Sequence, residues 1–247
     1  MHGTGSEDLG SGQDPEVVRS PERPGASSPT SELRSARLDM PRSGRTNQAE
    51  SRALDVVAAA KAALRADVLA SRRAKSADER SATGGKLRDA VLELPEMQMA
   101  GTVAAYVSVG TEPESRGLIF ALWKRGTYVL LPVLLPDGEL DWASYEGPDS
   151  LAPGSRGLRE PTEPRRGVAA ITSADVVVVP ALAVDRQGRR LGRGGGSYDR
   201  ALARVGSSIL TVALLYDGEL VDEVPVTEHD QHVRAAALPG EGIFRLC

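Results

Sequence analysis

The sequence predicts an α/β protein, with a three-layer α/β/α domain built on a mainly parallel sheet. Residues 174–180 (ADVVVVP) form an apolar, β-branched run that is typical of a central strand covered on both faces. Residues 102–107 and 128–132 are expected as strands on either side of a helix at 115–124, which makes a strand–helix–strand unit. Because helices and apolar strands alternate in this way, we expect a layered fold.

A helix is predicted before the first strand, over residues 50–73. Ala, Leu, Arg and Lys dominate this segment, and its apolar residues recur at steps of three and four. Lys61 and Arg65 are four positions apart and would project from one side of the helix. Such a pair is ordinarily part of a solvated face, although it could also bind an anion.

Ser76 and Glu79 have the spacing of a capping box, which predicts a second helix that starts at Ser76 and ends before Pro95. The later elements follow from apolar runs and from glycine and proline. We expect, in order, a strand at 140–145, a long surface connection to Pro164, a helix at 197–205, a strand at 209–215, and one short strand within 235–246.

The N-terminal segment differs from the rest of the chain. Residues 1–48 are crowded with Gly, Ser, Pro and charged residues and show no sustained apolar period. Such a segment buries too little surface to offset its ordering entropy. We therefore predict a disordered leader at 1–48 and a single domain at 49–247.

The net charge and the cysteine content exclude several classes of function. The net charge of −4 gives no long-range reason to expect nucleic-acid binding. Cys247 is the one cysteine, which excludes a disulfide within the chain and a cysteine-based metal site. No apolar run approaches the length of a membrane span. We expect a cytoplasmic monomer that acts on small molecules and binds neither nucleic acid nor membrane.

The segment 189–199 (RRLGRGGGSYD) stands apart in composition. Its glycines would let backbone N–H groups converge on one ligand, and its three arginines suit a polyphosphate. Asp199 would repel that anion unless a cation such as Mg²⁺ lay between them. The pattern is neither a Walker A loop nor the dinucleotide fingerprint. On spacing alone, a flexible glycine-rich surface loop with solvated arginines explains the segment equally well.

The longer string from Pro180 through Asp185 and Gly188 to RRLGRGGGSYDRAL resembles the signature of the 5-formyltetrahydrofolate cyclo-ligase family. Further matches follow in order along the chain: KAALR at 61–65, YVSVGTEPES at 106–115, LPVL at 131–134, GLREP at 157–161 and VPVTEHD at 224–230. The resemblance covers residues 55–245. It implies that the chain converts 5-formyltetrahydrofolate to 5,10-methenyltetrahydrofolate, with Mg²⁺ as cofactor and ATP as co-substrate, which is hydrolysed to ADP and phosphate.

The resemblance also implies roles for particular residues. It places ATP on Lys61, Ala62, Ala63, Leu64, Arg65, Arg190, Leu191, Gly192, Arg193, Gly194, Gly195, Gly196, Ser197 and Tyr198. It places the folate on Val107, Glu112, Arg193, Gly194, Gly195, Gly196 and Ser197, and the metal on Asp199 and Asp230. Arg190 and Arg193 would be catalytic, because they would neutralise charge on a phosphoryl group that passes to the formyl oxygen.

Departures from the family pattern leave other functions open. Ser197 stands where the family has the first of two tyrosines, so a ring that could stack on the folate is missing. One alternative is therefore a catalytically impaired nucleotide- or phosphate-binding module of the same fold. Another is a sugar-phosphate isomerase or coenzyme A transferase, which would need no ATP. His229 and His232, three apart, are expected as solvated surface residues and not as zinc ligands.

Overall fold

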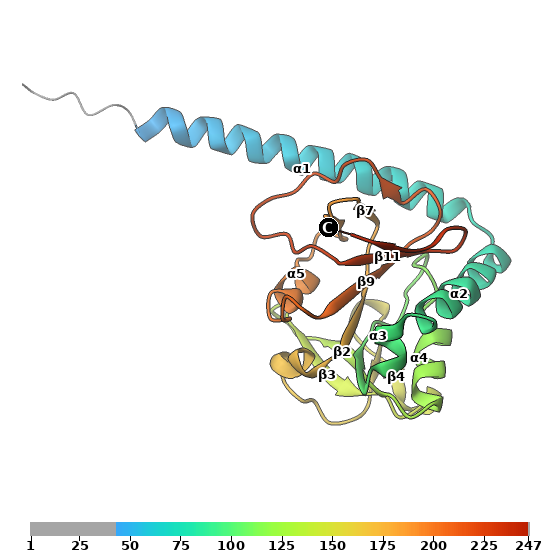
Figure 1. Ribbon diagram of the computed structural model, residues 1–247. Helices are drawn as coiled ribbons and strands as arrows, with labels where there is room; N and C mark the ends of the chain where they lie inside the picture. The colour runs from blue at the N-terminus through green and yellow to red at the C-terminus, as the bar shows by residue number, and fades with distance from the viewer. Residues whose placement is uncertain (1–42, 247) are drawn as a thin grey trace, which may run out of the picture. The chain divides into compact units, whose positions relative to one another are not determined.

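The computed structural model describes residues 43–246 (Figure 1). Helix α1 (Ser43–Ala74) is the helix expected at 50–73, and it begins several residues earlier. Most of the expected leader at 1–48 lies outside the described residues, so its disorder stays a prediction. No helix within residues 43–246 combines the length and the apolar character that a membrane span requires.

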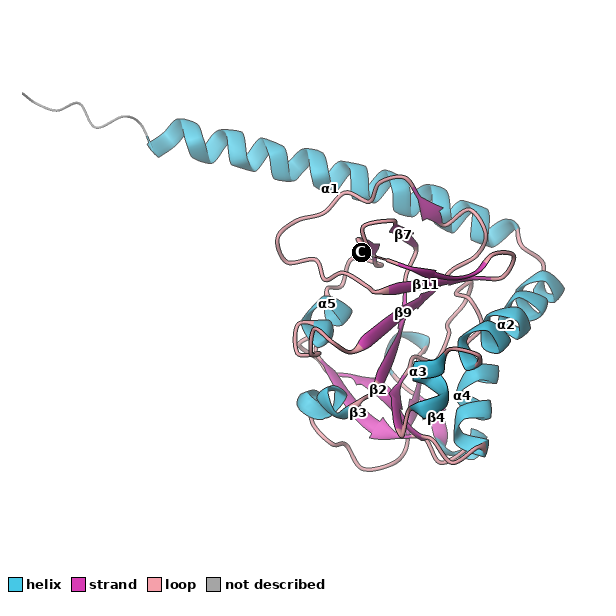
Figure 2. Ribbon diagram, in the orientation of Figure 1, coloured by secondary structure: helices cyan, strands magenta, loops and turns pink. Residues whose placement is uncertain are grey.

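A seven-stranded sheet forms the centre of the domain (Figure 2). Its strands in chain order are β1 (Thr102–Ala104), β2 (Tyr128–Leu134), β3 (Leu140–Ser144), β6 (Val176–Pro180), β9 (Leu210–Leu214), β11 (Ala235–Leu238) and β12 (Gly242–Arg245). The spatial order is β12-β11-β9-β6-β1-β2-β3. All pairings from β11 to β2 are parallel, and the edge strands β12 and β3 are antiparallel. The predicted fold class is confirmed.

Helices cover both faces of this sheet. On one face lie α2 (Ala77–Leu92), α3 (Pro95–Met99) and α4 (Arg116–Lys124), and on the other lie α5 (Ser197–Leu202) and the 3₁₀ helix η3 (Val168–Ser173). Strand β6 shows why its sequence is apolar throughout: Val176 and Val178 pack in the core that includes α2 and α4, while Val177 and Val179 pack in the core that includes α5. Both faces of this strand are buried, as the sequence predicts.

The capping box of α2 is confirmed. The Ser76 hydroxyl accepts a hydrogen bond from the Glu79 backbone N–H at 3.1 Å, and the Glu79 carboxylate accepts one from the Ser76 backbone N–H at 2.7 Å. Two donors that would otherwise be unsatisfied at the start of the helix are therefore satisfied. This fixes where α2 starts, directly after α1.

Three expectations for the sheet and its connections are corrected. The connection to Pro164 contains a small hairpin of β4 (Leu151–Pro153) and β5 (Arg159–Pro161), with the 3₁₀ turns η1 (Pro148–Ser150) and η2 (Ser155–Gly157); its three-residue strands are too short to show an alternating pattern. The single strand expected within 235–246 is two strands, because the chain turns at Pro239 and Gly240. Strand β1 ends at Ala104 and not at Val107 as expected, although the Ala105 N–H still donates to the Leu130 carbonyl of β2 at 2.9 Å.

A second, three-stranded sheet was not expected. It consists of β7 (Ala183–Asp185), β8 (Arg190–Leu191) and β10 (Leu220–Val221), and α1 packs on it through Leu64 and Val68. The buried Asp185 carboxylate accepts hydrogen bonds from the backbone N–H groups of Gln187, Arg189 and Val224. This carboxylate therefore organises the turn that leads into residues 190–196.

The topology indicates where a ligand would bind. After β1 the chain continues to β2 on one side, whereas after β6 it continues to β9 on the other. In open α/β sheets, a crevice opens at the carboxyl ends of two strands whose connections diverge in this way. The crevice expected here lies between the ends of β1 and β6.

Candidate functional site

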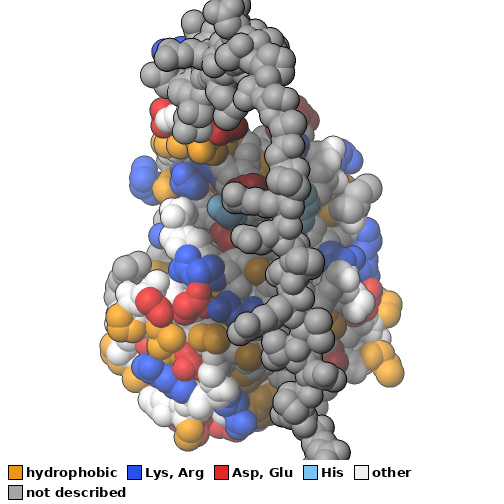
Figure 3. Space-filling view, turned by 90° about the vertical axis from the view of Figure 1, so that its left-hand side faces the viewer, with side chains coloured by type: hydrophobic (Ala, Val, Ile, Leu, Met, Phe, Trp, Pro, Cys, Tyr) orange, Lys and Arg blue, Asp and Glu red, His pale blue; other side chains and the backbone are white. Residues whose placement is uncertain are grey.

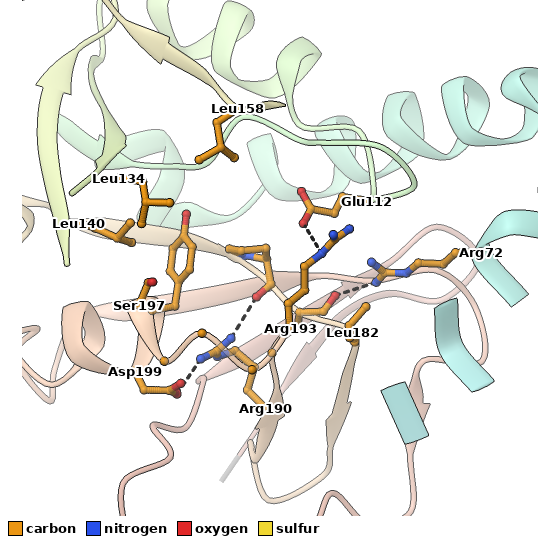
Figure 4. A pocket seen from close by; sticks show the side chains of 17 residues that line it. Arg72, Glu112, Leu134, Leu140, Leu158, Leu182, Arg190, Arg193, Ser197 and Asp199 are labelled. Carbon is orange, nitrogen blue, oxygen red and sulfur yellow. Dashed lines mark hydrogen bonds and ion pairs between the residues drawn. The ribbon is translucent and has the colours of Figure 1, made fainter. Parts of the chain in front are cut away.

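A cavity of about 330 Å³ lies at this crevice (Figure 4). Most of its lining comes from three segments: the loop after β1, which carries Glu112; residues 180–182, at the end of β6; and residues 190–199, without Leu191. Arg72, Leu134, Leu140 and Leu158 complete it. A volume of this size is typical of small-molecule sites. The glycine-rich segment singled out by the sequence therefore faces the main cavity.

The glycine loop presents unpaired backbone amides. Gly194 (φ 100°) and Gly196 (φ 69°) adopt backbone conformations that favour glycine. The N–H groups of Gly194, Gly195 and Gly196 find no backbone or side-chain acceptor within residues 43–246. Helix α5, which follows, is six residues long and shorter than the helix expected at 197–205. The loop itself therefore offers the main set of donors for an anion.

Helix α1 brings Arg65 to this loop and Lys61 to Asp230 in the C-terminal loop. Arg65 Nε donates to the Gly192 carbonyl at 2.9 Å, and Lys61 Nζ donates to Asp230 Oδ2 at 2.5 Å. Ala62 and Ala63 are exposed on α1, and Leu64 packs against the small core under α1. Of the predicted segment 61–65, the structure thus brings its two cations to the site. The four-residue spacing of Lys61 and Arg65 is the signal that pointed to them.

Arg190 and Arg193 occupy contrasting environments. The Arg190 side chain is 2% exposed, donates from Nη2 to Asp199 Oδ1 at 2.6 Å, and has a buried Nε with no partner within the described residues. The Arg193 side chain is 53% exposed, and its Nε lies 3.2 Å from Glu112 Oε1. Arg190 is fixed, whereas Arg193 can reorient towards a ligand.

Glu112 is a largely buried carboxylate in this cavity. Burial raises the pKa of its carboxyl, and the hydrogen bond from the Val109 N–H (2.9 Å) and the charge of Arg193 partly oppose that shift. Burial also raises the pKa of the Tyr198 hydroxyl, and the nearby Glu112 raises it further. An acceptor such as Glu112, held in a partly apolar cavity, is suited to bind N–H groups of a ligand ring.

A second cavity of about 90 Å³ adjoins the first and extends it along an apolar wall. Both cavities are lined by Glu112, Leu134, Leu140, Leu158, Pro180 and Tyr198. Val107, predicted to contact the folate, lines the second cavity and is 7% exposed. Figure 4 shows the three leucines towards one end of the site and Glu112 with Arg193 towards the other. The combined space has a polar, phosphate-sized part and an apolar part.

The predicted metal ligands are paired with cations. Within residues 43–246 no three His, Cys, Asp or Glu side chains cluster as a metal site. Asp199 accepts from Arg190 and from the Gln231 N–H through Oδ1, and Asp230 accepts from Lys61 and Thr227 through Oδ2. Within residues 43–246, the other oxygen of each carboxylate has no hydrogen-bond partner. His229 and His232 are exposed, in line with the sequence.

Several residues that line the two cavities were not predicted from the sequence. They are the apolar residues at the strand ends and one arginine: Tyr106, Pro132, Leu134, Leu140, Leu158, Ala181, Leu182 and Arg72. The leucines look like ordinary core residues, and Arg72 looks like one more charge on an Arg-rich helix. A side chain that faces a cavity has no signature of its own in a single sequence.

Charges of both signs are interspersed on the face of the molecule in Figure 3. Around the cavity this mixing takes the form of specific ion pairs, which join Lys61 to Asp230, Arg190 to Asp199 and Arg193 to Glu112. The site therefore holds its cations against nearby carboxylates instead of presenting an unbroken basic surface.

Comparison with known proteins agrees with the resemblance seen in the sequence. The model of the 5-formyltetrahydrofolate cyclo-ligase family matches residues 57–239. The 5-formyltetrahydrofolate cyclo-ligase of Mycolicibacterium smegmatis is 44% identical over 150 residues, which cover 59% of this chain and 77% of that protein. The enzyme of the same name from Escherichia coli K12 is 33% identical over 173 residues, which cover 69% of this chain and 95% of that protein.

The fold matches as well. The NMR structure of Aquifex aeolicus 5,10-methenyltetrahydrofolate synthetase superposes with a TM-score of 0.66 at 29% identity, covering 75% of this chain and 92% of that chain. The family match spans every residue that lines the cavity, from Arg72 to Asp199. The chain therefore belongs to the 5-formyltetrahydrofolate cyclo-ligase family, and its predicted enzyme class is confirmed.

Proposed function

We propose that this protein converts 5-formyltetrahydrofolate to 5,10-methenyltetrahydrofolate and hydrolyses ATP to ADP and phosphate in the same cycle. One observation carries the proposal: a glycine loop with unpaired amides and flanking cations opens into the same cavity as a buried carboxylate and an apolar wall. A phosphate donor and a ring substrate can therefore meet within one site.

The nucleotide phosphates would bind at the glycine loop. The amides of Gly194 to Gly196 have no acceptor within the described residues, Arg65 of α1 contacts the loop at Gly192, and Lys61 of α1 pairs with Asp230. Backbone amides and cations together are the usual means of binding a polyphosphate. The remaining residues of segment 61–65 would contribute by shaping the helix that carries these cations.

Magnesium fits the acidic residues of the site. Mg²⁺ is usually held by one or two carboxylates together with substrate phosphates and water, so a preformed cage of protein ligands is not required. Asp199 and Asp230 each have one oxygen free of hydrogen bonds within residues 43–246, and the Asp199 bond to the Gln231 N–H keeps their two segments together. A bound Mg²⁺ would neutralise phosphate charge next to these carboxylates.

The folate would lie along the second cavity, with its pterin ring at Glu112. An ionised Glu112 accepts hydrogen bonds, which suits the amino and N–H groups on the edge of a pterin. Val107 and the leucines would contact the apolar faces of the rings. Leu134, Leu140 and Leu158 supply part of the apolar contact that an aromatic ring at position 197 would otherwise give.

The chemistry follows from this placement. The formyl oxygen attacks the γ-phosphorus of ATP, the bond from that phosphorus to the β-bridging oxygen breaks, and ADP leaves. N10 of the folate then attacks the activated formyl carbon and gives up its proton, which the departing phosphate can accept, and the carbon–oxygen bond breaks as inorganic phosphate leaves the methenyl carbon between N5 and N10. Arg190 and Arg193 would stabilise the charge on the transferring group, and the protein acts mainly by positioning the two substrates.

An absorbance assay tests the proposal. The protein is mixed with 5-formyltetrahydrofolate, Mg²⁺ and ATP, and the methenyl-folate band is followed beside an ATP-free control. A rise that requires ATP supports the proposal. If ATP binds but the band does not rise, the chain is a nucleotide-binding module of the same fold, and Ser197 is the first departure to examine.

A further inference from the structure

Arg72, in the last turn of α1, is a fully buried arginine. Its Nε and Nη2 donate to the two carboxylate oxygens of Glu219, each at 2.7 Å, and Nη2 also donates to the Ala181 carbonyl at 2.6 Å. This two-pronged arrangement is the strongest kind of arginine–carboxylate pair. The end of α1 is therefore tied to the loops that follow β6 and β9.

Packing alone does not call for a charge at this position. A buried ion pair is often no more stabilising than apolar residues of the same volume, because both charges lose their hydration. Two observations point from Arg72 to the candidate site instead. The side chain lines the main cavity together with Glu112, and its buried Nη1 has no hydrogen-bond partner within the described residues.

A chain of contacts connects Arg72 to the backbone of Glu112. Glu219, held by Arg72, accepts a hydrogen bond from the Tyr216 N–H at 2.9 Å, and the Tyr216 hydroxyl donates to the Glu112 carbonyl at 3.3 Å. The Arg72 guanidinium also lies 5.4 Å from the centre of the Tyr216 ring, within cation–π range. Tyr216 therefore links the buried ion pair to the loop after β1.

Arg72 also acts on Glu112 through its charge. Five ionisable side chains interact electrostatically with Glu112: Arg72, Arg193, Tyr106, Tyr198 and Tyr216. Burial raises the pKa of Glu112, whereas Arg193 and Arg72 both lower it. Arg193 is half exposed, so solvent and salt screen its charge, but the charge of Arg72 lies in the interior and is screened much less.

We propose that Arg72 is a positioning residue for Glu112. It keeps the Glu112 carboxylate ionised when Arg193 swings away to a ligand, and through Glu219 and Tyr216 it holds the Glu112 backbone in place. The consequence for catalysis rests on the proposed function, because an ionised Glu112 matters there as the acceptor for the pterin edge. The role of Arg72 in setting the charge of Glu112 does not depend on the substrate.

The test removes both charges of the buried pair, so that no carboxylate is left alone. The double variants are Arg72→Gln with Glu219→Gln and, as a second version, Arg72→Met with Glu219→Met. The matched control is Glu219→Gln alone, which keeps the arginine. Circular dichroism melts identify the double variant that folds like the wild type. Carboxyl ¹³C NMR of labelled protein then gives the titration midpoint of Glu112, assigned by the loss of its signal in Glu112→Gln.

The titration midpoint of Glu112 is expected to be higher in the double variant than in the Glu219→Gln control, because the two proteins differ at Glu112 by the positive charge of Arg72. In the absorbance assay, the acid limb of kcat/KM for 5-formyltetrahydrofolate should move to higher pH by the same amount. Equal midpoints in the double variant and the control would overturn the proposal. If the wild type shows no turnover, the proposed function fails, and the NMR titration still decides the role of Arg72.

Discussion

Replacing Arg193 by alanine should separate catalysis from stability. The side chain is 53% exposed, and its ion pair with Glu112, at 3.2 Å, is the contact it would lose. Surface ion pairs contribute about 1 kcal/mol or less to folding, and this pair lies at the upper end of that range because the Glu112 side chain is only 11% exposed. An arginine that stabilises a transferring phosphoryl group contributes about 10³-fold or more to kcat, or roughly 4 kcal/mol of transition-state stabilisation. We therefore expect turnover to fall about a thousandfold while the free energy of unfolding falls by about 1 kcal/mol.

A matched control distinguishes the two effects. Arg245 is 49% exposed and pairs with Glu96 at 2.8 Å, away from the residues that line the cavity, so Arg245→Ala should cause a similar small loss of stability and no loss of turnover. Urea denaturation measures the stability of each variant, and the methenyl-folate absorbance measures kcat. The reasoning fails if Arg193→Ala retains the wild-type kcat, or if its activity falls only in proportion to its folded fraction.

Three further changes test other parts of the site. Burial raises the pKa of Glu112, so this carboxyl favours the folded state at low pH and loses that contribution as the pH rises through its folded pKa. The Glu112→Gln variant should therefore be more stable than the wild type at pH 7 but not below the ordinary glutamate pKa of 4.5, which thermal melts at both pH values measure. The same variant should bind the folate more weakly, which a folate titration measures. Ser197→Tyr should lower KM for the folate by adding a ring to the cavity wall, and an unchanged or higher KM would contradict that role. Removing Mg²⁺ with a chelator should weaken ATP binding, as measured by calorimetry. In Asp199→Asn, the difference between the ATP affinities with and without Mg²⁺ should be smaller. Equal ATP affinities of the wild type with and without the metal would exclude a metal-bridged site.

The features predictable from the sequence are those that local patterns specify. The β-branched run at 174–180 gives β6 because each of its valines meets one of two cores. Ser76 and Glu79 set the start of α2 through bonds between residues three apart. The glycine loop could be predicted because glycine is the residue that suits positive φ angles and close approach of the backbone to a ligand.

Features that depend on distant contacts could not be predicted in this way. Arg72 resembles its exposed neighbour Arg73, and the partner that buries it, Glu219, is 147 positions away. The strands β7, β8 and β10 are two or three residues long and lie within or near the signature, so they show no alternating pattern. The ion pair between Lys61 and Asp230 likewise could not be predicted from the sequence, because it forms only when the fold brings α1 beside the C-terminal loop.

The paired charges of the site are consistent with a ligand that carries both signs of charge. Three cations of the site are held by carboxylates, Lys61 by Asp230, Arg190 by Asp199 and Arg193 by Glu112, whereas Arg65 donates to the Gly192 carbonyl. An anion alone would capture the cations and leave their carboxylates unpaired in a partly buried cavity, which is unfavourable. ATP bound with Mg²⁺, together with a folate that offers N–H donors, would give every group a new partner: phosphates for the cations, the metal for the aspartates, and the pterin edge for Glu112. On the proposed function, this exchange of partners explains why three carboxylates lie among the cations of a phosphate-binding loop.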